Sequence, residues 1–544
     1  MRTQNRTLVW ALAAGTLLLA LSLAGLWAYV DLVHPVPFYT VKYDPEMPYM
    51  LNSLAIFKSR PYQYYDHPGT PVEFIGTVIL ALMRPALQLG SDAFWTYLLA
   101  HPEVFLRVAH GLLTLGSVAT LSLFCMRAVR VESWSDVPIA LGAGASYFVL
   151  LPEHGLRTLN FWSHDSFSFP AGTLILLVLL LRLRSAKPVE AWEVALAGIA
   201  TGLLTAVQLY FATWVLGAAV SIGLFVVFTG RGVFRGLAAG AGVGLGAALG
   251  FLMATGPILH RYRDFAWWVR SLVVHQGRFG QGPTGVATPA GLLANLRELW
   301  TAAPGLFVGA GLALVLLGVA GYANRSMLKE RPGWWALALG IPVQFVAVML
   351  LIAKHPAPPY LLAPAAIIPI LLVMALGILR TQGRRLRWLS ASIGVGLVVL
   401  FAINLASAIS RHRASVSAFE QRAAELADQI RTEADRLGKS PDSMVILWGY
   451  GMESGCYALR FGDRYTGRAF NEEINEICAN DWTYEASVDL AELPDGSRPL
   501  GESNGWDMLI VRSSDRRSDF EQYGRLTFSA DGSIVFLHPA GAGP

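Results

Sequence analysis

Long apolar runs constrain this chain more than any other feature of its sequence. Residues 7–30 are apolar over enough length to cross the hydrocarbon layer of a membrane, which is roughly 30 Å thick. A soluble core cannot bury many such runs, and hydrophobic residues make up 54% of the chain against 15% charged residues. We therefore predict a polytopic α-helical membrane protein with about eleven transmembrane helices. The further runs lie at 104–126, 137–152, 167–183, 190–206, 211–229, 236–257, 301–320, 334–353, 359–380 and 388–409.

The first run is predicted to stay in the mature protein as a span. The hydrophobic part of a cleaved signal peptide is usually only about 7–15 residues long, which is shorter than residues 7–30.

Basic residues between the apolar runs predict the orientation. The net charge of +4 is spread over several connections and forms no single basic face, so nucleic acid is not an expected partner. Residues 71–89, which contain Glu73, Arg84 and Pro85, are predicted to form a juxtamembrane amphipathic helix and not a span, because the basic clusters then all fall on one face. The positive-inside rule makes that face cytoplasmic, together with the N-terminus. The clusters are Arg2, Arg6, Arg127, Arg130, Arg182, Arg184, Lys187, Arg231, Arg235, Arg325, Lys329, Arg331, Arg380, Arg384, Arg385 and Arg387.

The same topology places four segments on the outer face, where we expect the chemistry. They are the loops 31–103, 153–166 and 258–300 and the tail that follows residue 410. We predict a transmembrane domain over 1–410 and a soluble periplasmic α/β domain over 411–544, because the tail has a polar helical stretch and then strand-like segments. The strand-like segments are Met444 to Trp448, Met508 to Val511 and Ile534 to Leu537.

Two of the three cysteines, Cys456 and Cys478, share the tail, whereas Cys125 lies in a span. An oxidising compartment would let Cys456 and Cys478 form a disulfide, and two free thiols are the alternative.

Acidic residues in two outer loops are the main candidates for catalysis. Asp44 and Glu46 lie in the first loop, and Asp165 lies in the second loop, just before the span at 167–183. The alternative interpretation is structural, since an aspartate before a helix is a common N-cap and Pro45 suits the first turn.

The order of these features resembles the GT-C superfamily of polyprenyl-phosphate-sugar-dependent transferases, of the protein O-mannosyltransferase and aminoarabinose-transferase type. The resemblance is best over residues 1–230. That family has an acidic pair in the first outer loop, then Lys-Pro-Pro or His-Pro-Pro, then an aspartate at the fourth span. Asp44 with Glu46, His67-Pro68-Gly69 and Asp165 occupy those places. Pro45 splits the usual adjacent pair, and Gln208 stands where the family often has a lysine.

The resemblance implies a GT-C-like fold and a glycosyltransferase of a bacterial inner (plasma) membrane, either hexosyl or pentosyl. Asp44 would be the general base of a single inverting displacement. Glu46 and Asp165 would position the acceptor, adjust the pKa of Asp44 or hold a divalent metal, and these roles stay open. No other cofactor is expected.

Basic and aromatic residues on the outer face are candidates for binding the lipid phosphate or the acceptor. Lys354 and His355 precede the segment from Tyr360 to Pro364, which is similar to a Tyr-Leu-Leu-Pro element of the family. A lysine here also suits contact with lipid headgroups. Further candidates are His67, Arg157 in the second loop and Arg261 in the basic loop 258–300.

The expected partners are a polyprenyl-phosphate-linked sugar, membrane lipid and an envelope glycan, lipid or protein acceptor. A multi-span transporter or lipid flippase with a periplasmic binding domain is the leading alternative, and a non-catalytic scaffold is another. A transporter favours ionisable residues near the middle of the membrane and an internal repeat. The acidic residues here cluster instead in outer loops, which favours an enzyme.

Overall fold

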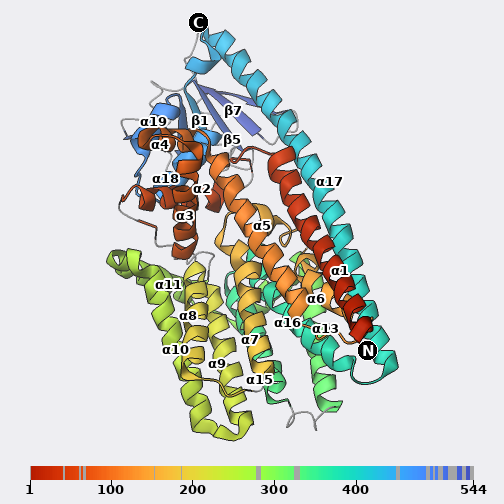
Figure 1. The fold of residues 1–544 in the computed structure, drawn as a ribbon. Helices are drawn as coiled ribbons and strands as arrows, with labels where there is room; N and C mark the ends of the chain where they lie inside the picture. The colour runs from red at the N-terminus through yellow and green to blue at the C-terminus, as the bar shows by residue number, and fades with distance from the viewer. Residues whose placement is uncertain are drawn as a thin grey trace. The chain divides into compact units, whose positions relative to one another are not determined.

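The computed structural model describes residues 2–539 of the chain with internal gaps (Figure 1). The gaps are residues 41–42, 61–62, 65–68, 152, 186, 277–282, 324–330, 449–453, 486–489, 494–495, 500–506, 513–523 and 530–533. Internal contacts divide the chain into two compact units. The helical unit comprises Met1–Tyr29, Tyr64–Phe74 and Ala109–Ile409, and the mixed unit comprises Val30–Gln63, Ile75–Val108 and Ser410–Pro544.

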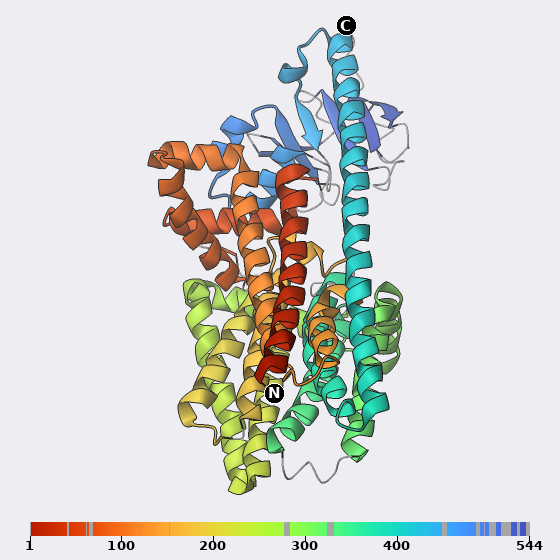
Figure 2. The same cartoon turned by 45° about the vertical axis from the view of Figure 1, so that its right-hand side comes forward.

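The helical unit is built from long apolar helices joined by short turns (Figures 1 and 2). Its long helices are α1 (Arg2–Ala28), the second part of α5 (Pro102–Arg127), α6 (Asp136–Leu150), α7 (Leu174–Arg184), α8 (Ala191–Val207), α9 (Ala212–Val226), α10 (Val233–Thr255), α11 (Tyr262–Val274), α12 (Pro289–Ala302), α13 (Pro304–Ala323), α15 (Pro332–Lys354), α16 (Leu362–Leu379) and the first part of α17 (Arg384–Leu437). Its short turns include η2 (Arg157–Asn160), η3 (His164–Phe167), η4 (Ser168–Thr173), η5 (Leu209–Phe211), η7 (Gly256–Arg261) and η9 (Pro358–Leu361).

The helix lengths confirm a multi-span membrane protein. Among the described residues, nine helices are long and apolar enough to cross a membrane, and there are ten if α12 and α13, bent by 105°, count as one span. Two shorter apolar helices are α6 and α8. Every run predicted from the sequence coincides with one of these helices. The nine also include α3 (Thr70–Leu87), which meets the criteria of length and composition, so its interfacial location stays a prediction.

Helix α16 lies at the centre of the helical unit. Eighty-nine per cent of its most apolar window is buried, more than in any other span in the described part of the chain. It packs against α6, α13 and α15, and the hydroxyl of Thr173 in η4 donates to the carbonyl of Ala366 at 2.8 Å. A helix surrounded by protein has no polar face to present, which explains why its sequence is apolar all round.

Glycines bring α8, α9 and α10 close together. The three helices pack against one another, and Figure 1 shows them side by side. A Cβ atom on Gly250 of α10 would lie 2.4 Å from the carbonyl oxygen of Ile199 in α8, whereas one on Gly244 would meet nothing within 4 Å. Small residues that allow such close approach are typical of helix pairs in membranes, where packing replaces the hydrophobic effect.

The mixed unit combines helices of the first loop with a sheet from the tail. Its helices are α2 (Tyr43–Phe57), α4 (Ser91–Ala100), most of α3, the start of α5, the end of α17, α18 (Gly455–Arg464) and α19 (Asn471–Ile477). The strands are β1 (Ile446–Trp448), β2 (Asp481–Glu485), β3 (Leu490–Leu493), β4 (Gly496–Pro499), β5 (Met508–Arg512), β6 (Gly524–Phe528) and β7 (Ile534–Pro539).

The strands form one mixed sheet in the order β4-β3-β2-β1-β5-β7-β6, with β1 parallel to both β2 and β5. Its core contains Met444, Ile446, Tyr457, Met508 and Phe536, together with Ala434 of α17. The α/β character of the tail and its three predicted strands are therefore confirmed. Cys456 of α18 and Cys478 after α19 form a disulfide with a Cα–Cα distance of 5.7 Å, and Cys125 is a buried free cysteine.

The units differ from the predicted domain boundaries in one respect. The break after Ile409 lies next to the predicted boundary at residue 410, but most of the first loop belongs with the tail. The reason is packing, because α18 lies against α2 and a Cβ atom on Gly462 would come within 2.8 Å of the Cβ atom of Met47.

We predict that Gly250→Ala destabilises the helical unit and that Gly244→Ala does not. The first change forces a methyl group against the Ile199 carbonyl and should cost about 1–3 kcal/mol by overpacking, whereas the second fills open space on the same helix. The thermal unfolding midpoints of the two purified variants, compared with wild type, measure the difference. Equal midpoints for the two variants would contradict the close packing of α8 and α10.

Candidate active site

Asp165 lies where the second loop becomes a span. The turn η3 that contains it is followed directly by η4 and α7, which together form the span His164–Arg184. Asp165 is buried, and the position before η3 is occupied by Ser163 without a side-chain cap hydrogen bond. The N-cap alternative considered for Asp165 therefore does not describe its contacts.

Asp165 accepts a hydrogen bond from the hydroxyl of Tyr210, and both side chains are buried. The ring of Tyr210 lies 5.7 Å from the ring of Tyr360, measured between centroids. His164 adds a ring nitrogen 3.5 Å from the Asp165 carboxylate. The structure thus joins two of the predicted residues, Asp165 and Tyr360, through Tyr210, which lies between them.

A helix break at Gln208 places Tyr210. Gln208 has the extended angles φ −160° and ψ 136°, and its side-chain oxygen accepts from the backbone N–H of Leu209 at 3.0 Å. Because the side chain satisfies a backbone group released by the break, the chain can turn into η5 within the apolar unit. The sequence analysis noted Gln208 as a departure from the family pattern but did not identify Tyr210 as a candidate site residue. The feature of the sequence that could have indicated it is a tyrosine directly after a span.

The second loop is held by hydrogen bonds to its backbone. The hydroxyl of Thr114 in α5 donates to the carbonyl of Leu159 at 3.0 Å, and that of Ser166 donates to the carbonyl of Phe161 at 2.6 Å. Trp162 is completely buried. Arg157, a predicted binding residue, lies in η2 with its guanidinium 4.8 Å from the centre of the Phe161 ring. This loop is therefore a packed structure that holds Asp165 in place.

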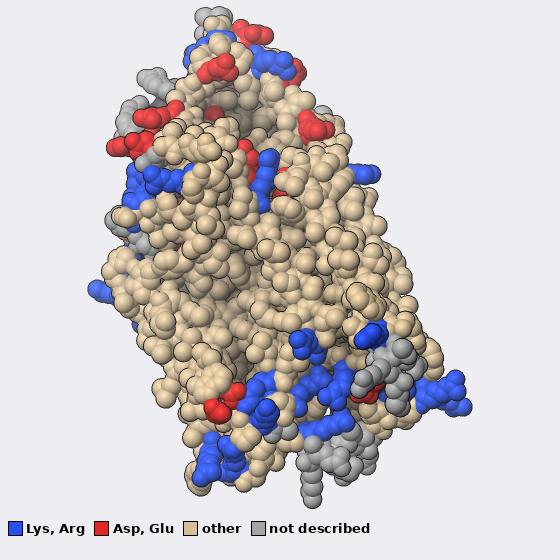
Figure 3. All heavy atoms as spheres, in the orientation of Figure 1, with Lys and Arg blue, Asp and Glu red and all other residues tan. Residues whose placement is uncertain are grey.

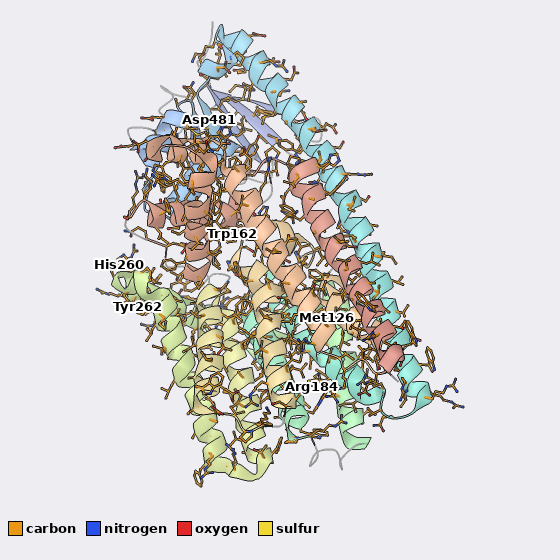
Figure 4. All side chains as sticks on the ribbon, in the orientation of Figure 1. Met126, Trp162, Arg184, His260, Tyr262 and Asp481 are labelled. Carbon is orange, nitrogen blue, oxygen red and sulfur yellow. A yellow bond between two sulfur atoms is a disulfide. The ribbon has the colours of Figure 1, made fainter. Side chains whose placement is uncertain are left out.

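Lys354 and His355 hold the loop 258–300. The ammonium of Lys354 donates to the carbonyls of Val273 and Val286, and a ring nitrogen of His355 lies 2.7 Å from the carbonyl of Leu272. Lys354 ends α15, and His355 and Tyr360 lie in the short connection between α15 and α16. Arg261, at the end of η7, forms an ion pair with Asp264 at 2.6 Å. Figure 4 labels its neighbours His260 and Tyr262 in this segment.

Asp44 and Glu46 lie at the start of α2 in the mixed unit. Asp44 has extended backbone angles, φ −106° and ψ 117°, which is the conformation of an N-cap residue, and Pro45 follows at the first helical position. Its side chain reaches solvent, but the surrounding protein removes enough water to raise its pKa from 3.8 to about 6. Glu46 is buried.

The tail domain contacts the helix that bears Asp44. The side-chain amide of Asn52 in α2 donates to the carbonyl of Tyr465 at 3.4 Å. After α2, Lys58 and Arg60 both donate to Glu473 of α19, at 3.2 and 2.6 Å. The Arg60 guanidinium also lies 4.7 Å from the centre of the Phe470 ring. These contacts join the first loop to the C-terminal domain.

His67, with Pro68, lies outside the described residues. Among the residues that are described, no three His, Cys, Asp or Glu side chains are grouped so that they could hold a metal ion.

The comparisons with known proteins concern the fold. Neither a protein-family model nor a curated protein sequence matches this chain. A crystal structure of ArnT from Cupriavidus metallidurans in the apo state is similar to it, with a TM-score of 0.50 and 15% identity, over 98% of this chain and 99% of that chain. The chain has the fold of ArnT. A second crystal structure, of the same ArnT bound to undecaprenyl phosphate, has a TM-score of 0.48 and 15% identity, over 97% of this chain and 98% of that chain.

ArnT is a GT-C glycosyltransferase, so the fold predicted from the resemblance is confirmed. The similarity to ArnT extends over nearly the whole chain, whereas the sequence resemblance was best over residues 1–230. The loops that follow the seventh predicted span and the tail are therefore also parts of the ArnT fold.

We predict that Glu473→Gln destabilises the mixed unit by about 1 kcal/mol, because the partly buried pairs with Lys58 and Arg60 lose their charge. Partial burial alone would raise the pKa of Glu473, but hydrogen bonds, including those from Arg60 and Lys58, outweigh it and the pKa lies below its ordinary value. The stabilisation should therefore be present above about pH 4.5 and be lost as the pH falls through the lowered pKa.

Unfolding midpoints of wild type and Glu473→Gln at pH 7 and pH 4 test this pair. The difference in unfolding midpoint between the two proteins should be smaller at pH 4 than at pH 7. Glu472→Gln is the matched control, since Glu472 is the exposed neighbour on the same helix. An equal loss in both variants at pH 7 would contradict a specific role for Glu473.

Proposed function

We propose that this chain is a membrane glycosyltransferase that moves a sugar from a polyprenyl-phosphate donor to an acceptor on the outer face of a bacterial inner membrane. The observation that carries the proposal is the buried Asp165–Tyr210 pair at the entrance of a span, in a chain with the ArnT fold. Burial of an ionised carboxylate beside hydrocarbon costs free energy. A carboxylate that is nevertheless held there by a tyrosine and an ordered loop indicates a functional site. The donor class is supported by the sequence resemblance and by the undecaprenyl phosphate bound to ArnT in one crystal structure.

The proposed orientation rests on where the arginines lie. Arg130, Arg184, Arg331 and Arg380, from four separate connections, line one cavity and therefore share one end of the helical unit. Arg325 and Lys329 of the same predicted face lie outside the described residues. The positive-inside rule makes the arginine end cytoplasmic. Asp165 stands at the opposite end of the span His164–Arg184, so we propose that it faces the outer, periplasmic side. The periplasmic location of the C-terminal domain remains a proposal from the distribution of basic residues along the sequence.

Asp44 is the proposed general base. It takes the proton from an acceptor hydroxyl or amine as that atom bonds to the anomeric carbon of the sugar. The bond from this carbon to the phosphate oxygen breaks, the configuration inverts, and the polyprenyl phosphate leaves. A carboxylate with a pKa of about 6 is a stronger base than an ordinary aspartate and is still ionised at pH 7. Glu46 beside it would tune this pKa or position the acceptor.

Asp165 is proposed to orient the acceptor, with Tyr210 fixing its carboxylate. The leaving phosphate needs cationic or hydrogen-bond donors, and His67, Arg157, Lys354, His355, Tyr360 and Arg261 remain the proposed set. The ammonium group of Lys354 has three N–H donors, and two of them donate to backbone carbonyls. We propose that the third N–H donates to the phosphate. A divalent metal held by Asp44, Glu46 or Asp165 is an open part of the proposal.

Transfer from radiolabelled polyprenyl-phosphate sugars, measured in membranes with wild type and Asp44→Asn, tests the proposed base. We expect at least about a hundredfold loss, because removal of a general base typically costs 10²–10⁴ in rate. Asp92→Asn is the matched control, since it removes an exposed aspartate of α4 in the same unit. A folded Asp44→Asn protein with full activity would exclude the base assignment.

Tyr210→Phe should lower transfer about tenfold by releasing the Asp165 carboxylate, and Asp165→Asn should lower it further. Gel filtration of both purified variants in detergent checks their folding. If Tyr210→Phe keeps wild-type activity and Asp165→Asn does not, the tyrosine is not a positioning residue.

The pH dependence of transfer follows from the pKa of Asp44. Since the base must be ionised, activity should rise with pH through about 6 and fall tenfold per pH unit below it. Initial rates between pH 4.5 and 8, with folding monitored at each pH, give the profile. An inflection near 4 would contradict the assignment of Asp44 as the base.

No transfer by wild type from any donor would overturn the proposed function. The multi-span transporter or flippase would then be favoured, and a lipid flux assay in vesicles would test it.

A further inference from the structure

Four arginines that are distant in sequence line one cavity of about 300 Å³ in the helical unit. Arg130 follows α5, Arg184 ends α7, Arg331 precedes α15 and Arg380 follows α16. Figure 3 shows Lys and Arg side chains gathered at this end of the unit, and Figure 4 labels Arg184 there. Among the described residues, Glu132 also lines the cavity, and Asp136 forms an ion pair with Arg380. The four arginines outnumber these two carboxylates.

Two of the arginines are held in place by the protein. Arg380 donates to Asp136 at 2.8 Å and to the carbonyl of Arg130 at 2.9 Å. Arg184 donates to the carbonyl of Ala128 at 2.5 Å, and its guanidinium lies 5.6 Å from the centre of the Trp334 ring. These contacts fix the direction of both groups and leave further N–H donors on each, since a guanidinium has five.

The other two arginines that line the cavity, Arg130 and Arg331, are exposed. Within the described part of the chain, neither forms an ion pair with a carboxylate. Guanidinium groups gathered in a partly enclosed space repel one another, and a bound anion would remove that cost. The remaining wall includes Leu183, Trp334 and Val373, which offers an apolar surface next to the charges.

We propose that this cavity binds a phosphate group, carried either by the headgroup of an anionic phospholipid or by a free phosphate compound. Planar arginine forks match phosphate oxygens in pairs, and two fixed and two exposed arginines can surround one phosphate. Basic pockets between spans on the cytoplasmic side are suited to anionic headgroups. The site is separate from the candidate active site, since Arg184 and Asp165 stand at opposite ends of the span His164–Arg184, roughly 30 Å apart for a helix of this length.

Binding to the purified full-length chain in a neutral detergent tests the site. The probes are dioctanoyl phosphatidylglycerol, dioctanoyl phosphatidylcholine and inorganic phosphate, each titrated at one fixed ionic strength. We expect phosphatidylglycerol or phosphate to bind at least tenfold more tightly than phosphatidylcholine binds. Tight phosphatidylglycerol with weak phosphate identifies a lipid headgroup site, whereas phosphate that binds tightly and displaces phosphatidylglycerol identifies a site for free phosphate compounds. Equal affinity for phosphatidylglycerol and phosphatidylcholine, with no phosphate binding, overturns the proposal.

The variant Arg130→Gln/Arg331→Gln should weaken binding of the anion at least tenfold, because each charge-assisted hydrogen bond contributes to affinity on that scale. Arg231→Gln/Arg235→Gln is the matched control, since it removes two exposed arginines of the same predicted face outside the cavity. Equal weakening in both double variants would overturn the proposal in favour of a general charge effect. If the glutamine variant does not fold, Arg130→Lys/Arg331→Lys keeps the charge without the planar fork and should bind with intermediate affinity. Wild-type affinity in that variant and in single Arg130→Gln and Arg331→Gln proteins would also overturn it.

Discussion

The need to hydrogen-bond every backbone group within hydrocarbon determines where this protein can depart from helix. Irregular backbone occurs where side chains or neighbouring carbonyls satisfy the released groups. Gln208 accepts from Leu209 at the break after α8, and Thr114 donates to Leu159 in the second loop. The same places carry the residues with candidate chemistry. Tyr210 comes shortly after Gln208 in the chain, and Asp165 comes shortly after Leu159, so the residues with candidate chemistry lie close in sequence to backbone groups that are satisfied in this way.

The two ends of the span His164–Arg184 have opposite chemistry. One end holds a buried carboxylate with a tyrosine donor, and the other opens into a cavity lined by arginines. The apolar helix between them keeps the carboxylate and the arginines far apart, so the charges at the two ends do not pair with each other. This separation supports the proposal of two distinct sites, one at each end of the span. The net charge of +4 therefore says little about the protein unless the locations of the charged residues are known.

The C-terminal domain has a structural role that its sequence alone does not predict. Its helices α18 and α19 contact the segment that begins with Asp44, through Asn52, Lys58 and Arg60. A short helix such as α2 gains little stability by itself, so its packing partners determine how firmly its first residues are held. Changes in the tail can therefore alter the surroundings of Asp44 without any contact with a substrate.

The sequence by itself determined the places of the apolar runs, the α/β character of the tail and the positions of the acidic residues between the runs. Hydrophobic length and period are local properties, so they can be read without coordinates. The sequence could not show that Tyr210 donates to Asp165, that Lys354 is engaged by two loop carbonyls, or that four arginines from separate connections share a cavity. Those pairings join residues from 45 to 250 positions apart in the chain, so only the tertiary structure decides them. The burial that raises the pKa of Asp44 is likewise a property of its neighbours, because the same Asp-Pro-Glu segment exposed to water would titrate near its ordinary value.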